Sequence, residues 1–180
     1  MTHVQASKRT YEESCRYLQQ AGWLDANASI PALPASRPNY DDAILGVEFF
    51  RTLLSDAKLE YLTLPRMYFG RSEIRNVSFA GSDLSESTFC WNNFIQVSFI
   101  KCDLSNSDLR AALFENVDFS DANLANTDMR RSEYIGCTLL NANMTGVKLT
   151  RKQGEQLPLS MEQNQQIDWQ DFDGDEPGGG

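Results

Sequence analysis

A large apolar residue recurs at every fifth position through the middle of the chain. The segment FENVDFSDANLANTDM, residues 114–129, contains four examples of this spacing. An α-helix repeats its faces about every 3.6 residues and a flat strand every two, so neither structure explains a period of five. Followed in both directions, the series continues without a slip through Phe69, Ile74, Phe79, Leu84, Phe89, Phe94, Phe99, Leu104, Leu109, Phe114, Phe119, Leu124, Met129, Tyr134, Leu139, Met144 and Leu149.

A second pattern accompanies the first. The position two before each large residue is mostly small, and the position directly before it is often Asp or Asn, as in SDLSE, CDLSN and ANLAN. Residues 67–151 therefore resemble the pentapeptide-repeat family, whose pattern is A(D/N)LXX. The resemblance implies a right-handed quadrilateral β-helix with four pentapeptides per coil. In that fold the large and the small residue of each repeat point inward, and the other three face solvent.

Stacking of residues twenty apart is consistent with this all-β core. One column contains Phe79, Phe99, Phe119 and Leu139, and coils paired like strands lie about 4.8 Å apart. The seventeen large positions predict about four coils. Asn92 is the one polar residue among the larger inward positions. It indicates either a strained or ligand-binding point or an internal hydrogen bond to the backbone.

The sequence predicts four regions along the chain. Residues 1–58 form an N-terminal helical region and cap, 59–151 the repeat coil, 152–169 a C-terminal capping helix, and 170–180 a disordered acidic tail. Thr10 and Glu13 make a capping box for a helix over 10–21, which Gly22 ends. A Pro-rich linker (28–38) and a largely buried second helix (39–58) follow. A box formed by Ser160 and Gln163 predicts the short C-terminal helix, ending near residue 169.

Composition narrows the class of protein. There is no apolar run of 18 residues and no apolar segment typical of a secretory signal near the start, which predicts a cytoplasmic protein. The four cysteines form no CxxC pair, and we expect reduced thiols. The formal net charge is −9, and residues 152–180 contribute −6 of it.

Catalytic groups are hard to assemble from this sequence. The single histidine is His3, and no Gly-rich phosphate loop is present. The stacked carboxylates Asp83 and Asp103 are interpreted as solvated surface residues. We therefore predict no enzyme activity and no cofactor. We also predict no metal site, because the aspartates of the tail lack the glycine position and the closing glutamate of a calcium loop.

The outward positions predict a partner-binding surface. One corner of the coil gathers arginines around Trp91, and the side that follows it carries outward aliphatic residues. Trp and Arg are enriched at interface hot spots, and clustered outward apolar residues indicate a covered surface. Two alternatives remain open: that helix 10–21 covers this side, or that Arg110 and Arg130 simply pair with Asp108 and Asp128. The candidate residues are Arg71, Trp91, Ile95, Arg110, Leu113, Arg130, Arg131 and Ile135, with Asp171, Asp173, Asp175 and Glu176 in the acidic tail.

Two functions follow as hypotheses. The flanks LPRMYFGRSEIRNVSF, DLSESTFCWNNF and IDW…DGDEPGGG resemble bacterial pentapeptide-repeat proteins associated with toxin or secretion loci, which implies an immunity protein that binds and neutralises a toxin or effector. The alternative is a DNA mimic acting on DNA gyrase or topoisomerase, of the quinolone-resistance type. Mimicry needs a polyanionic coil, whereas residues 67–151 have a net charge of only −2. We expect a protein partner, with no direct binding to nucleic acid or membrane.

Overall fold

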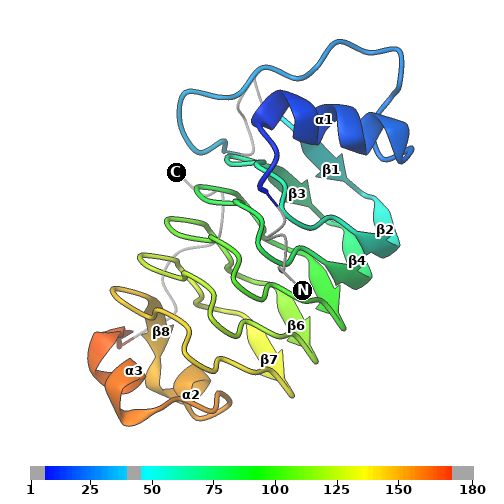
Figure 1. Cartoon of the computed structure of the whole chain (residues 1–180). Helices are drawn as coiled ribbons and strands as arrows, with labels where there is room; N and C mark the ends of the chain where they lie inside the picture. The colour runs from blue at the N-terminus through cyan, green and yellow to red at the C-terminus, as the bar shows by residue number, and fades with distance from the viewer. Residues whose placement is uncertain (1–6, 40–45, 172–180) are drawn as a thin grey trace, which may run out of the picture.

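The repeat region winds into a square coil. The computed structural model describes residues 7–39 and 46–171, and Figure 1 shows the coils stacked as parallel rungs. Each strand pairs in parallel with the residues twenty positions later, as in the pair Phe94 and Phe114. The predicted quadrilateral β-helix is confirmed. Its strands are β1 (Glu48–Phe50), β2 (Leu53–Lys58), β3 (Tyr68–Gly70), β4 (Glu73–Ser78), β5 (Asn93–Ile95), β6 (Leu113–Glu115), β7 (Glu133–Ile135), β8 (Lys148–Thr150) and β9 (Asp168–Gln170).

The coil has four sides, numbered here along the chain. Side 1 is the five-stranded sheet β2-β4-β5-β6-β7. The ends of β2 and β4 also pair on side 2, through Ala57 with Val77 and Lys58 with Ser78. Elsewhere sides 2 and 3 are held by isolated bridges, such as Ser98 with Asp118 on side 2 and Asp103 with Asn123 on side 3. Side 4 contains the pairs β1-β3 and β8-β9, with bridges between them.

A left-handed backbone makes every corner. From Arg51 to Gly146, each fifth residue has a positive φ, and only three of these residues are glycine. Residues outside glycine rarely adopt this conformation, so its repetition turns the chain regularly from one side to the next.

The predicted inward residues fill the core. Aromatic rings of successive coils stack, with centroids 5.4 Å apart for Phe79 and Phe99 and 5.1 Å for Phe94 and Phe114. All four cysteines are buried free thiols. Full burial of a large apolar side chain contributes roughly 1.5–3 kcal/mol, so the inward series strongly fixes the register.

Asn92 lies in this core, 1% exposed, and is internally satisfied. Its side-chain amide donates to the carbonyls of Phe69 and Cys90, both at 3.0 Å, and its Oδ1 accepts from the Ser72 N–H at 2.7 Å. Of the two interpretations of this residue, the structure shows the hydrogen bond to backbone.

The predicted helix over 39–58 is wrong in its described part. Residues 48–50 and 53–58 form β1 and β2, and Phe49, Leu54 and Leu59 are buried and continue the inward series. The coil therefore begins before residue 59. It has five complete coils from Phe49 to Lys148, and β9 adds part of a sixth, against the four predicted.

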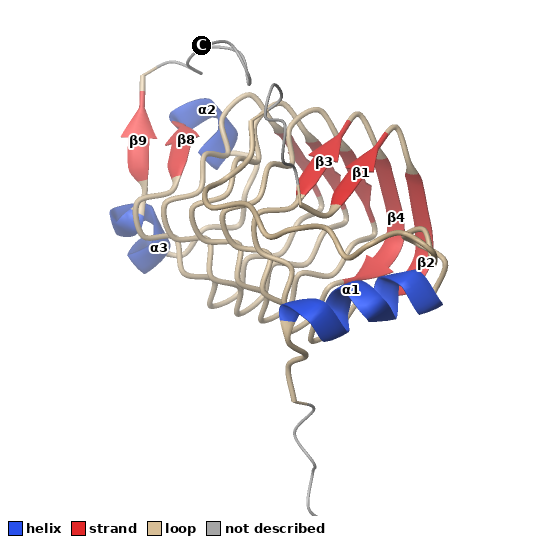
Figure 2. Ribbon diagram, turned by 90° about the horizontal axis from the view of Figure 1, so that it is seen from above, coloured by secondary structure: helices blue, strands red, loops and turns tan. Residues whose placement is uncertain are grey.

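Helix α1 (Tyr11–Gln20) closes the N-terminal end instead. Its predicted capping box is present, with the Thr10 side chain accepting from the Glu13 N–H. Figure 2 shows α1 at one end of the coil and α3 with β9 at the other. The Pro-rich segment packs along the coil: the carbonyls of Pro34 and Pro38 accept from Arg66 and Thr88, each at 2.7 Å.

Two short helices close the C-terminal end, where one helix to residue 169 was expected. They are α2 (Arg151–Gly154) and α3 (Met161–Gln166), and both begin with a capping box. The side-chain amide of Gln163 donates to the carbonyls of Leu139 and Ala142, at 2.7 and 3.1 Å. Gln153, ten residues earlier, does the same for Met129 and Ser132, both at 3.0 Å. Glutamine side chains thus supply hydrogen bonds that a further coil would have made.

Candidate functional site

Trp91 lies at the corner between sides 4 and 1. Its φ is +60° and it is 47% exposed. Arg71 precedes it by one coil and Arg131 follows it by two, in the same corner column. The corner thus places a large aromatic side chain in solvent within a cationic column, as the sequence predicted.

The aliphatic candidates lie on side 1. Ile95 is opposite Arg75 and Glu115, and Ile135 is opposite Glu115 on the last strand. Ile135 is 53% exposed, whereas Ile95 and Leu113 are half-buried. Among the predicted residues, the most exposed apolar side chains are therefore Trp91 and Ile135, and Leu53 of β2 is a further exposed side chain on side 1.

Arg110 and Arg130 pair within side 4. Arg110 donates to Asp108 at 2.6 and 2.8 Å, and Arg130 donates to Asp128 at 2.7 and 2.9 Å. Their side chains are only 17% and 13% exposed. Burial by itself raises the pKa of Asp108, but the hydrogen bonds and charge of Arg110 outweigh it and hold that pKa below its ordinary value.

Helix α1 makes its hydrogen bonds at the first coil. The Tyr17 hydroxyl donates to the Lys58 carbonyl, and the Thr63 N–H donates to the Ser14 hydroxyl, both at 2.8 Å. These contacts lie on sides 2 and 3 of the first coil. They leave Trp91 and Ile135 exposed in the structure.

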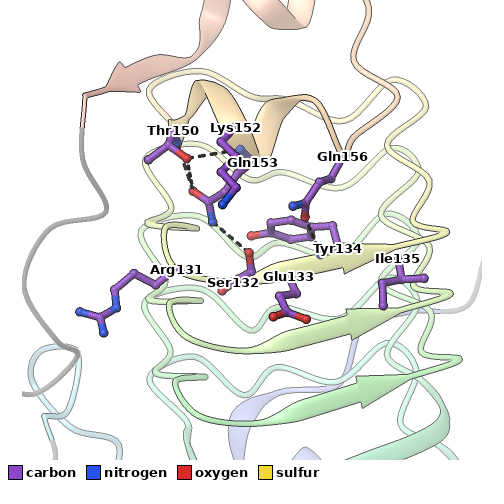
Figure 3. Close-up of a pocket in the computed structure, with 9 residues that line it drawn as sticks. All are labelled: Arg131, Ser132, Glu133, Tyr134, Ile135, Thr150, Lys152, Gln153 and Gln156. Atoms are coloured by element: carbon purple, nitrogen blue, oxygen red, sulfur yellow. Dashed lines mark hydrogen bonds between the residues drawn. The ribbon is translucent and has the colours of Figure 1, made fainter.

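A depression of about 370 Å³ lies at the open end of side 1, between β7 and α2. Figure 3 shows Glu133 and Ile135 along one edge and Lys152 and Gln156 along the other, with Arg131 at the corner. The Tyr134 N–H donates to Gln156 Oε1 at 3.3 Å across this gap. Sequence reasoning found Arg131 and Ile135 but missed Lys152 and Gln156, because they follow the repeat. No sequence signal marked Lys152, and the only signal for Gln156 was its ten-residue spacing from Gln166.

Comparison with known proteins agrees with this geometry. Residues 72–149 match the model of the family described as "Pentapeptide repeat region". Residues 72–149, which form most of the coil, are thus a pentapeptide repeat region. No curated protein matches the sequence.

A solved pentapeptide repeat structure shares the fold. HetL, involved in heterocyst differentiation regulation in the cyanobacterium Nostoc sp. strain PCC 7120, is 17% identical with a TM-score of 0.54, over 56% of this chain and 48% of HetL. The chain thus spans about half the length of HetL, and the likeness concerns the fold alone. Two further matches are a trypsin-treated form of QnrB1, a plasmid-mediated fluoroquinolone resistance protein (22% identity, TM-score 0.38, 61% of this chain and 56% of that one), and Rfr23 from the cyanobacterium Cyanothece 51142 (18%, 0.31, 58% and 85%).

Of the four candidates in the acidic tail, Asp171 alone lies within the described residues. Asp171 is exposed directly after β9, whereas His3, Asp173, Asp175 and Glu176 fall outside the described residues. Within residues 7–39 and 46–171, no group of three or more His, Cys, Asp or Glu side chains could hold a metal ion. In the same residues, no helix is long and apolar enough to cross a membrane.

Proposed function

We propose that this protein is a non-enzymatic scaffold that binds and neutralises a bacterial toxin or effector. The observation that carries the proposal is the exposure of Trp91 beside side 1. A left-handed corner favours Gly or Asn, and a half-exposed side chain contributes little to the core. A half-exposed tryptophan at such a position is better explained by contact with a partner than by packing within the coil.

The surface around Trp91 suits a protein partner. Ile135 supplies a second apolar contact, and the corner column supplies Arg71 and Arg131. The five paired strands of side 1 form a stiff support, so little conformational entropy is lost on binding. The cationic corner disfavours the alternative of DNA mimicry, which requires an anionic surface.

The proposal is tested by co-purification with the product of a neighbouring toxin gene and by survival of cells that express that toxin. The double variant Trp91→Glu, Ile135→Glu is expected to fold and to lose both binding and protection. Leu140→Glu is the matched control, because Leu140 is 65% exposed but lies on side 2. Retained binding by the double variant would place the interface elsewhere, and inhibition of gyrase supercoiling would favour the alternative function.

A further inference from the structure

The ladder of side 1 stops at β7 although its register continues beyond it. Successive strands from β2 to β7 pair with an offset of twenty residues. The next strand would occupy residues 153–155, but residues 151–154 form α2. The depression beside β7 lies where the ladder would have continued (Figure 3).

Other parts of this end are closed more firmly. On side 4, β9 pairs with β8. On side 3, the N–H groups of Met144 and Gly146 donate to the side chain and backbone carbonyl of Gln166, at 3.0 and 2.8 Å. On side 1, Gln156 is exposed and holds the Tyr134 N–H at 3.3 Å, beyond the 2.7–3.2 Å of ordinary N–H to oxygen bonds. On the same side, the Ser132 carbonyl accepts from the buried Gln153 side-chain amide at 3.0 Å. A strand added here must therefore replace two glutamine side-chain contacts, one to the Tyr134 N–H and one to the Ser132 carbonyl.

The groups around the depression indicate what would fit. An added pentapeptide in register would place its third residue beside Glu133 and its fifth beside Ile135. Its first residue would lie at the corner near Arg131, where Arg151 now follows β8 and begins α2. Arg131 and Lys152 favour an acidic first residue, Glu133 a neutral polar third residue, and Ile135 an apolar fifth residue. The second and fourth residues would face the closed end of the core and must be small.

We propose that an extended segment of the partner protein adds to β7 as a parallel sixth strand of side 1 and displaces the side chains of Gln153 and Gln156. Addition of a strand to an open sheet edge gives affinity through backbone hydrogen bonds and specificity through alternate side chains. This inference rests on the proposed function, since it says how the partner is held.

The test is an NMR titration of the 15N-labelled full chain with the peptide acetyl-Asp-Ala-Thr-Ala-Val-amide. Saturable shifts are expected at the amides of residues 133–136. The matched probe is the same peptide N-methylated at Thr and Val, whose amide hydrogens would face β7. This probe keeps the side chains but loses the two donors, and it is expected to bind at least tenfold more weakly.

Two variants of the protein test the same binding site. Gln156→Ala is expected to tighten binding of the unmethylated peptide severalfold, because no side chain then competes for the Tyr134 N–H. Leu140→Glu is expected to leave binding unchanged. Equal binding of both peptides, or shifts that vanish at high salt, would overturn strand addition.

The outcome is separable from that of the proposed function. Failure of the peptide with a successful co-purification would mean that the partner binds side 1 without adding a strand. Peptide binding without any protein partner would refute neutralisation but keep the edge site. Concentration-dependent shifts at residues 133–136 in the absence of peptide would identify a second copy of this chain as the occupant and overturn the assignment to a partner.

Discussion

At the scale of single residues, the corners carry much of the conformational cost of this fold. A left-handed backbone costs roughly 1–2 kcal/mol for an ordinary L-residue, whereas Asn and Gly adopt it more readily. Lys101 has a φ of +56° and an exposed side chain. We predict that Lys101→Asn raises the free energy of unfolding by up to about 1 kcal/mol, measured by urea denaturation. Lys101→Val should lower it, because a β-branched side chain fits this conformation poorly. Equal stability of the two variants would contradict this account.

Asn92 shows how a polar residue is accommodated in the same core. Asn92→Ala would leave the Ser72 N–H and two carbonyls without their partner, at about 1–3 kcal/mol for a buried group left unsatisfied. Asn92→Ser should be milder, because Ser132, two coils later, accepts from the Ala112 N–H and donates to the Leu109 carbonyl. Thermal unfolding of both variants checks the order; a milder effect for Ala would refute the assigned role.

At the scale of elements, the C-terminal cap depends on glutamine side chains. Gln163→Ala removes the donor to the Leu139 and Ala142 carbonyls and is predicted to destabilise the last coil by about 1–3 kcal/mol. Amide hydrogen exchange should rise first in residues 138–146. Gln170→Ala, which removes an exposed bond to Asp168, serves as control and should change stability by less than about 0.5 kcal/mol.

The acid–arginine pairs of side 4 predict a pH dependence. The folded state lowers the pKa of Asp108, so the stabilisation from this group is complete above the unfolded value of about 3.9 and is lost as pH falls through the lower folded pKa. Urea unfolding between pH 7 and pH 2.5 should show this loss. Asp108→Asn should flatten that part of the profile, and an unchanged profile would refute the assignment.

Sequence anticipated the elements that carry a regular signal. The inward series and both capping boxes are where the residues placed them. The strands of the first coil were missed because Phe50 and Leu53 face outward beside inward Phe49 and Leu54, and this density of apolar residues resembles a buried helix. Leu53 is 60% exposed. The depression could not be predicted, since it exists only because α2 replaces a strand beside β7.

For the candidate site, the sequence predicted only which residues face outward in each column of the coil. Register alone placed Trp91 and Ile135 on the outer surface. It could not decide whether Arg110 and Arg130 were open, because their pairing depends on side-chain geometry on side 4. The sequence-only alternative of pairing with Asp108 and Asp128 is what the structure shows.

At the scale of the whole molecule, one coil is the unit that can be removed. Deleting residues 109–128 takes out one complete coil, keeps every inward column in phase and is predicted to leave a folded, less stable protein. Deleting residues 109–118 removes two sides of a coil. The inward columns would then stack out of phase, with each side above the opposite side of the preceding coil, and folding should fail. Circular dichroism and urea unfolding distinguish these outcomes; a well-folded ten-residue deletion would contradict the model of four sides per coil.

The pairing offset of twenty residues also fixes distances on the surface. Two outward groups in one column can be separated only by whole multiples of about 4.8 Å, so Arg71 and Arg131, three coils apart, are held at a spacing that side-chain substitution elsewhere does not alter. Partners that recognise such a column must match a discrete set of lengths. The inward residues of all four sides pack into one core, whereas the outward residues of each side are separate. Each side can therefore acquire its own specificity while the other three keep theirs.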